Sequence, residues 1–214
     1  MQSMHTHTTR ILIVTPEAAY LPHQLGAGSE CLSAKAGGLG DVSAALIDQL
    51  QRRGIDVHVA LPNYREIFDD CLTKILRQGD TTMRQVLPED RLHLAEDHAI
   101  AHRQSIYFGE GAENVRFALS FQREVINNIM PRVAPDLIHC HDWMTGLVPA
   151  AAKKLAIPCL FSVHNIHTKD ILLAELEERG IDPTPFWQQL YYRDMPGDYD
   201  QVKWSNPLDP LVSG

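Results

Sequence analysis

The feature that most constrains the fold is a glycine-rich turn, Lys35–Val42 (KAGGLGDV), that leads directly into a helical pattern. Apolar residues recur behind it at helical spacing, which predicts a helix over Leu39–Arg53 that stops at Gly54. A helix start leaves backbone N–H groups without partners, and its dipole favours an anion there. Glycines also let a ligand approach the backbone closely. The turn therefore predicts a phosphate or sugar-phosphate site, with a loop that only packs a strand against a helix as the alternative.

Short apolar runs alternate with helical patterns along the rest of the chain. This order predicts right-handed crossovers and an α/β, Rossmann-like fold with a mostly parallel sheet flanked by helices. The predicted strands are Arg10–Thr15, Ile55–Leu61, Asp136–Cys140 and Pro158–Val163. The further predicted helices are Glu113–Met130, Thr145–Leu155, Ile171–Arg179 and Phe186–Tyr192. Residues 80–109 alternate more loosely, which is interpreted as a β-hairpin or as edge strands ending at Ser105–Phe108.

Composition excludes several classes of function. The chain has 214 residues and a formal net charge of −8 without a basic block, which argues against binding to nucleic acid. Its apolar runs are far shorter than the roughly 18 residues of a membrane span. No apolar segment of a secretory signal follows the N-terminus, so a cytoplasmic protein is expected. The four cysteines lack a CxxC pair and are interpreted as buried thiols: Cys31, Cys71, Cys140 and Cys159.

Three motifs stand in sequence order: residues 34–46 (AKAGGLGDVSAAL), His139–Leu147 (HCHDWMTGL) and Val163–Asn165 (VHN). Together they resemble the N-terminal signature of glycogen synthases and starch synthases (glycosyltransferase family 5). The resemblance implies that residues 10–214 form the N-terminal catalytic lobe of a two-lobed GT-B glycosyltransferase. The C-terminal nucleotide-binding lobe would then be absent from this chain, and residues 1–9 are interpreted as a disordered leader.

The activity implied by the resemblance is transfer of glucose from ADP-glucose to the non-reducing end of an α-1,4-glucan, with retention of configuration. Such transferases work without a metal or other cofactor, because Lys and Arg side chains replace a divalent ion. Most of those side chains would belong to the absent lobe. The lobe on its own is therefore expected to be inactive.

The resemblance also assigns roles to individual residues. Lys35 and the amides of Gly37 and Gly38 would contact the phosphates or the glucosyl unit. His164 would lie close to the anomeric carbon, and Asp142 would bond sugar hydroxyls. His141 and Asn165 complete the expected substrate-binding set, and no metal ligand is expected.

These residues follow predicted strands, or lie in the loops after them, so they should converge on the carboxyl edge of one sheet. A purely structural role stays open for each. Asp142 could simply cap the helix that follows it, and His164 could satisfy a buried carbonyl. Trp143 could stack on a sugar face, or it could only pack inside its turn.

The chain departs from the family pattern at three places. Ala36 replaces the usual Thr or Ser, and Met144 replaces a second His, which puts an acceptor contact from that position in doubt. The loop Pro16–Ser33 is longer than the family's usual stretch and is interpreted as a lid, an acceptor-specific insertion or disorder.

Rival functions remain open on the sequence. A metal-dependent hydrolase is suggested by a group of potential ligands: His139, Cys140, His141, Asp142, His164 and His167. This group lacks the spacing of known metal motifs. A glycosyltransferase for another nucleotide sugar also fits the motifs, as does a stand-alone sugar- or phosphate-binding module.

Overall fold

The computed structural model describes residues 8–26, 29–68, 91–107 and 111–214. Its sheet has five strands in the order β3-β2-β1-β4-β5, and every neighbouring pair is parallel. The strands are β1 (Arg10–Val14), β2 (Asp56–Pro62), β3 (Leu92–Ala95), β4 (Leu137–His141) and β5 (Cys159–Ser162). The prediction of an α/β, Rossmann-like fold with a parallel sheet is confirmed. The strand order reverses between β1 and β4, which is where open α/β sheets bind ligands.

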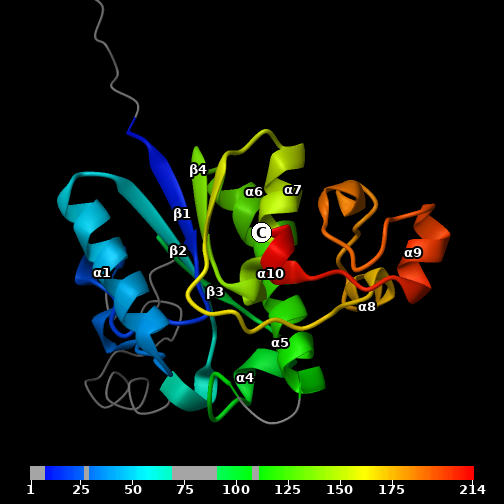
Figure 1. The fold of residues 1–214 in the computed structure, drawn as a ribbon. Coiled ribbons are helices and arrows are strands. Elements are labelled where there is room, and N and C mark those ends of the chain that lie inside the picture. The colour runs from blue at the N-terminus through cyan, green and yellow to red at the C-terminus, as the bar shows by residue number, and fades with distance from the viewer. Residues whose placement is uncertain (1–7, 27–28, 69–90, 108–110) are drawn as a thin grey trace, which may run out of the picture.

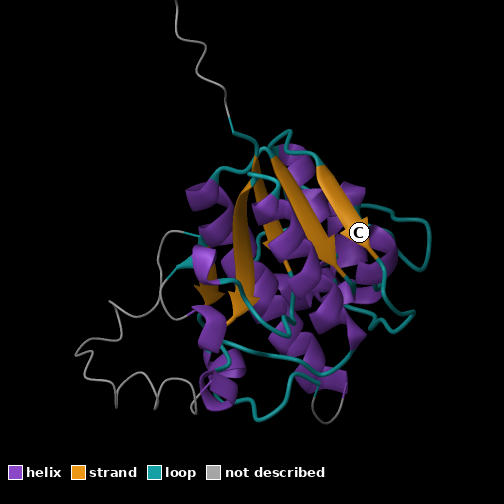
Figure 2. Ribbon diagram, turned by 90° about the vertical axis from the view of Figure 1, so that its left-hand side faces the viewer, coloured by secondary structure: helices purple, strands orange, loops and turns teal. Residues whose placement is uncertain are grey.

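Helices cover both faces of the sheet (Figures 1 and 2). They are α1 (Gly38–Arg52), α4 (His98–Ala101), α5 (Gly111–Glu124), α6 (Met130–Val133), α7 (Val148–Lys154), α8 (Leu173–Glu178), α9 (Tyr199–Ser205) and α10 (Pro210–Ser213). Figure 1 shows α1 on one face and α5, α6 and α7 on the other. Leu12, Ile13 and Val14 of β1 are fully buried, as the continuous apolar run of a strand covered on both faces requires. Within the described residues, none of the helices is long and apolar enough to span a bilayer.

The predicted helix Glu113–Met130 is longer than expected and is not uniform. It runs as α5, then as a π-helical turn over Val125–Ile129, and continues as α6. Pro131 lies just after this turn, and a proline without an N–H disrupts the regular hydrogen-bond ladder. The helix predicted over Leu39–Arg53 is confirmed as α1, and Gly54 ends it with a φ of 78°.

Of the two interpretations of residues 80–109, the edge strand is found and the hairpin is not, in the part that the structure describes. The strand there is β3, which pairs in parallel with β2 and ends at Ala95. The strand ending at Ser105–Phe108 is wrong for residues 105–107, which form a bend where the guanidinium of Arg103 donates to the carbonyls of Ser105 and Ile106. Residues 80–90 and 108–109 lie outside the described residues.

The C-terminal segment is more ordered than its prolines suggest. Helix α10 begins with Pro210, where a missing N–H costs nothing, and Asp209 accepts hydrogen bonds from the amides of Leu211 and Val212. The helix lies against the turn after β4: a Cβ at Gly146 would meet the Pro210 carbonyl oxygen at 1.8 Å. Only a short 3-10 turn, Trp187–Gln189, is found where a helix was predicted over Phe186–Tyr192.

The loop Pro16–Ser33 is built into the core where the structure describes it. It contains two 3-10 turns and three leucines at 1% exposure, namely Leu21, Leu25 and Leu32. These leucines contradict the interpretation as disorder for residues 16–26 and 29–33. The cysteine prediction holds for buried Cys140 but not for exposed Cys31, while Cys159 is half-buried and Cys71 lies outside the described residues. Most of the predicted leader, residues 1–7, also lies outside them.

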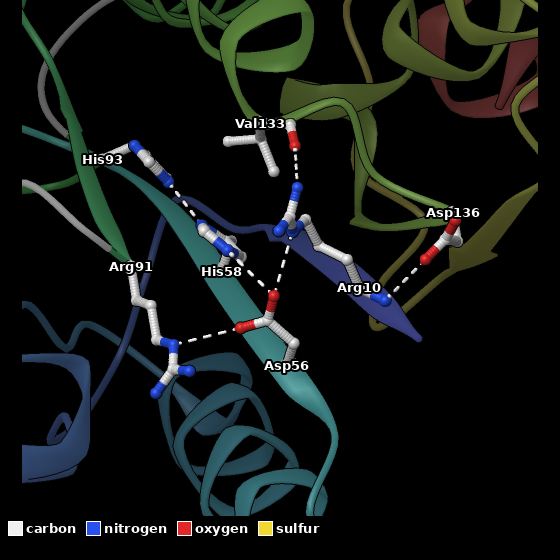
Figure 3. A network of polar contacts seen from close by, with 7 residues as sticks. All are labelled: Arg10, Asp56, His58, Arg91, His93, Val133 and Asp136. Atoms are coloured by element: carbon white, nitrogen blue, oxygen red, sulfur yellow. Dashed lines mark hydrogen bonds and ion pairs between the residues drawn. The ribbon is translucent and has the colours of Figure 1, made fainter. Parts of the chain in front are cut away.

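A polar network crosses the amino ends of the strands, opposite the ligand-binding edge (Figure 3). Asp56 of β2 accepts from the Nε atoms of Arg10 and Arg91 at 2.9 and 3.0 Å. Burial works to raise the pKa of Asp56, but the Arg10 hydrogen bond and the neighbouring positive charges hold it below its ordinary value. His58 Nε2 is 3.6 Å from the same carboxylate, and His58 Nδ1 is 2.9 Å from His93 Nε2.

Arg132 fixes the direction of this histidine chain. Its guanidinium can only donate, and it lies 3.1 Å from His93 Nδ1, so that nitrogen accepts. The neutral His93 ring then carries its proton on Nε2 and donates to His58 Nδ1. Burial, together with the nearby His58 and Arg132, lowers the pKa of His93 to about 4, and burial also lowers the pKa of His58. Both rings are therefore neutral near pH 7.

We expect this chain of neutral histidines to make the fold acid-sensitive. In the unfolded chain His93 takes up a proton near pH 6.5, but in the folded chain only near pH 4, so stability falls as the pH drops through that window. The variant His93→Gln keeps a donor and an acceptor but cannot titrate. Between pH 7 and pH 5, the free energy of unfolding from urea titrations should fall by about 2 kcal/mol less in this variant than in the unmodified protein.

The matched control is His23→Gln, which removes an exposed histidine. It should lose as much stability between the two pH values as the unmodified protein does. Equal acid sensitivity of the His93→Gln variant and the unmodified protein would contradict the assignment of a depressed pKa to His93.

Candidate functional site

A cavity of about 820 Å³ opens at the carboxyl ends of the strands. Pro16 and Glu17, just after β1, line one side, and Asp142, directly after β4, lines another. The cavity therefore lies at the point where the strand order reverses. Five of the residues predicted from the sequence line it: Gly37, Gly38, Asp142, His164 and Asn165. The segments that follow β1, β4 and β5 thus converge on one cavity, as predicted. Two of the predicted residues, Lys35 and His141, are not among those that line it.

Asp142 organises the loop that follows β5. Its Oδ1 accepts from the backbone N–H of His164 at 2.6 Å, and its Oδ2 accepts from Asn165 Nδ2 at 2.8 Å. The carboxylate makes no capping hydrogen bond to the 3-10 turn that follows, Trp143–Thr145, so the interpretation of Asp142 as a simple cap is wrong. Its backbone has φ 59° and ψ 175°, a region that costs a non-glycine residue on the order of 1–3 kcal/mol. Strain of this kind accumulates at functional sites.

His164 is held through its side chain as well as its backbone. Its Nε2 lies 2.9 Å from Nδ1 of His141, and the two rings stack with centroids 5.1 Å apart. His141 also stacks on His139, whose Nε2 contacts the Ser162 hydroxyl at 2.8 Å. Burial, and then the neighbouring histidines, lowers the pKa of His141 to about 3, so its ring is neutral near pH 7. His164 contacts another histidine rather than the buried carbonyl considered from the sequence.

Glu17 is a site residue that the sequence reasoning missed. It is 1% exposed, and its Oε2 accepts from the backbone N–H groups of Ala36 and Gly37 at 2.8 and 2.9 Å. Its Oε1 accepts from the hydroxyl of Tyr107, and burial together with this bond raises the pKa of Tyr107 above its ordinary value. The Gly37 amide, expected to contact a phosphate, thus bonds an internal carboxylate. The signal that could have identified Glu17 is its place in the sequence, in a Pro16-Glu17 pair shortly after the first strand.

Lys35 lies beside the cavity rather than in it. Its ammonium lies 2.7 and 2.8 Å from the carboxylate oxygens of Asp41, and both side chains are about half exposed, at 46% and 58%. An exposed pair of this kind is worth only about 0–1 kcal/mol. Lys35 could therefore leave Asp41 and bind a ligand anion at little cost in free energy. Its contact with a ligand stays a prediction. Another lysine, Lys169, does line the cavity, and the sequence reasoning did not single it out.

The residues considered as metal ligands are not arranged as a metal site in the part of the chain that the structure describes. Across the described ranges, no three His, Cys, Asp or Glu side chains are arranged to hold a metal ion. Asp142 is occupied by backbone and amide donors, and the facing nitrogens of His141 and His164 bind each other. Trp143 is 6% exposed and belongs to the hydrophobic core, although it also lines the cavity. Its contact with a sugar stays a prediction.

A model of the starch synthase catalytic domain matches residues 10–206 of the chain. A glycogen synthase of Desulfitobacterium hafniense is 32% identical in an alignment of 165 positions, which covers 67% of this chain and 35% of that protein. Glycogen synthase 2 of Geobacter metallireducens is 32% identical in an alignment of 182 positions, which covers 72% of this chain and 37% of that protein. The chain thus spans about a third of the length of these relatives.

Among solved structures, the catalytic domain of starch synthase IV from Arabidopsis thaliana, bound to ADP and acarbose, has a similar fold. The match has a TM-score of 0.59 and 22% sequence identity, and it covers 96% of this chain and 42% of that one. The likeness supports a GT-B lobe as the architecture of the chain.

Glu17 should hold the cavity wall together. Replacing it in Glu17→Ala leaves the part-buried amides of Ala36 and Gly37 and the Tyr107 hydroxyl without their acceptor, so the free energy of unfolding should fall by about 2 kcal/mol. Glu17→Gln keeps one acceptor oxygen and should lose about half as much. Urea titrations measure both. The control Glu30→Ala changes an exposed carboxylate and should stay within about 0.5 kcal/mol. A Glu17→Ala variant as stable as that control would contradict the role of Glu17 in holding the cavity wall.

Proposed function

The chain belongs to the starch synthase catalytic domain family, and from this premise we propose that its cavity is one wall of a glucosyltransferase site. The reaction proposed is transfer of glucose from ADP-glucose to the non-reducing end of an α-1,4-glucan, with retention of configuration. The observation that carries the proposal is the single cavity shared by the glycine turn, Asp142 and His164. A neighbouring fold bound to ADP and acarbose, a nucleotide and an oligosaccharide analogue, supports both ligand classes.

The proposed roles follow from how each residue is held. Asp142 already uses its carboxylate on His164 and Asn165, so it acts first by fixing these two residues against the sugar. Glu17 already binds the amides of Ala36 and Gly37, so the departing diphosphate would meet the N–H groups of the first turn of α1, which begins at Gly38. Because α1 has fifteen residues, its dipole is well developed at that end. Such preorganised dipoles favour the charge that builds on a leaving group.

We propose further that most of the nucleotide is held by a second lobe, so that this chain alone binds but does not transfer. A reducing, cytoplasmic setting for the chain is part of the same proposal. The matched relatives are about three times as long as the aligned region, which is consistent with further structure beyond this lobe.

Calorimetry with ADP-glucose, UDP-glucose and a maltooligosaccharide tests the function directly. Binding of ADP-glucose or the oligosaccharide, with no transfer of radiolabelled glucose by the chain alone, is the expected result. Binding of phosphate with no preference for either sugar ligand would instead favour a phosphate-binding module. Metal-dependent hydrolysis of a sugar nucleotide would overturn the proposal.

Lys35 and Asp41 offer a matched pair of variants for the phosphate contact. Lys35→Ala should weaken ADP-glucose binding about tenfold, because a charge-assisted hydrogen bond to phosphate is lost. Asp41→Asn removes the competing carboxylate and should leave the affinity unchanged or raise it. Both should keep the stability of the unmodified protein within about 1 kcal/mol, since the pair is exposed. Equal affinities of the two variants would show that Lys35 does not touch the ligand.

A further inference from the structure

His141 and His164 form a pair in which one ring is buried and the other reaches the cavity. His141 is 1% exposed, whereas His164 is an exposed residue that lines the cavity. Their facing nitrogens, Nδ1 of His141 and Nε2 of His164, are 2.9 Å apart. At that distance one nitrogen carries the hydrogen and the other accepts it. The direction of this bond decides which nitrogen of His164 is left to meet a ligand.

The second ring nitrogen of His141 settles the direction. This Nε2 is buried and has no hydrogen-bond partner within the described part of the chain. If His164 were the donor, the neutral His141 ring would carry its proton on Nε2, leaving a buried N–H without an acceptor. Buried orphan N–H groups are rare, and unsatisfied acceptors less so. The bond is more favourable when His141 donates from Nδ1 and its Nε2 remains a bare lone pair.

We propose that His141 is a positioning residue that sets the tautomer of His164. By donating from Nδ1 to His164 Nε2, it leaves the proton of the neutral His164 ring on Nδ1. No protein acceptor contacts that nitrogen in the described residues, so it offers an N–H donor to an oxygen atom of a bound ligand. A sugar hydroxyl or a phosphate oxygen is the matching chemistry. The identity of the ligand rests on the proposed function, whereas the tautomer does not.

Asp142, the residue after His141, also holds His164 in place. Asp142 accepts the backbone N–H of His164, while His141 bonds its ring. Two consecutive residues at the end of β4 therefore fix the main chain and the imidazole of the same residue after β5. Burial keeps the His141 ring neutral, with a pKa lowered to about 3, so the bond is not disturbed by titration of His141 near pH 7. His139 stacks on His141 but bonds the Ser162 hydroxyl instead of His164, which makes it a suitable control.

Nitrogen-15 NMR of the ligand-free chain, labelled on histidine, tests the tautomer without any substrate. At pH 7.5 the His164 ring should show a protonated Nδ1 and an unprotonated Nε2. The reverse pattern in the unmodified protein would overturn the proposal at once. This measurement needs no variant and no activity.

Three variants separate positioning from mere packing. His141→Leu removes the donor and should shift His164 toward the Nε2-protonated tautomer. His141→Asn can place an amide N–H close to the lost Nδ1 and should restore the original pattern. His139→Gln should leave the His164 tautomer unchanged. If His141→Leu does not fold, the spectra of His141→Asn and of the unmodified protein still test the tautomer of His164. If His141→Leu folds and the His164 tautomer is unaltered, the positioning role of His141 is contradicted.

Calorimetry with ADP-glucose and with a maltooligosaccharide then measures the consequence. For whichever probe binds, His141→Leu should weaken the affinity about fivefold, and His141→Asn should recover most of it. Loss of affinity in both variants alike would indicate a packing defect and count against the proposal. If neither probe binds the unmodified chain while the tautomer is as stated, the proposed function fails and the positioning role of His141 stands.

Discussion

The parallel pairing of β1 with β4 is the constraint on which the rest of this structure depends. It brings Val14 beside Cys140, so that two chain segments far apart in sequence leave the sheet at the same edge. The strand order reverses there, and the crossovers on the two sides run over opposite faces. The loops therefore diverge and leave a cavity between them. Glu17 and Asp142 reach that cavity only because this pairing exists.

Two buried carboxylates then shape the cavity in the same physical way. Glu17 accepts backbone N–H groups from the glycine turn, and Asp142 accepts one from the loop after β5. A buried charge is tolerated only when hydrogen bonds replace its lost water, and both carboxylates meet that condition. The same bonds offset the strained backbone of Asp142. Each carboxylate thus acts by holding the backbone that surrounds a ligand.

Histidine pairs connect strands at both ends of the sheet, with different consequences. At the amino end, Arg132 can only donate, and this fixes the proton positions of His93 and His58 in a chain that leads to the Asp56 carboxylate. At the carboxyl end, His141 has one nitrogen without a partner among the described residues. The first pair is a structural element that titrates below neutral pH. The second ends in the cavity, where its last N–H can meet a ligand.

The sequence alone determined the fold class, most strand positions and the set of turns that carry polar residues. Local spacing encodes these, because apolar periodicity and glycine turns act over a few residues. It also predicted that Asp142, His164 and the glycine turn converge, and they do line one cavity. It did not find Glu17, nor the bond between the rings of His141 and His164. Only the tertiary structure decided those points, because hydrogen-bond partners from separate strands depend on register and burial, which no local pattern records.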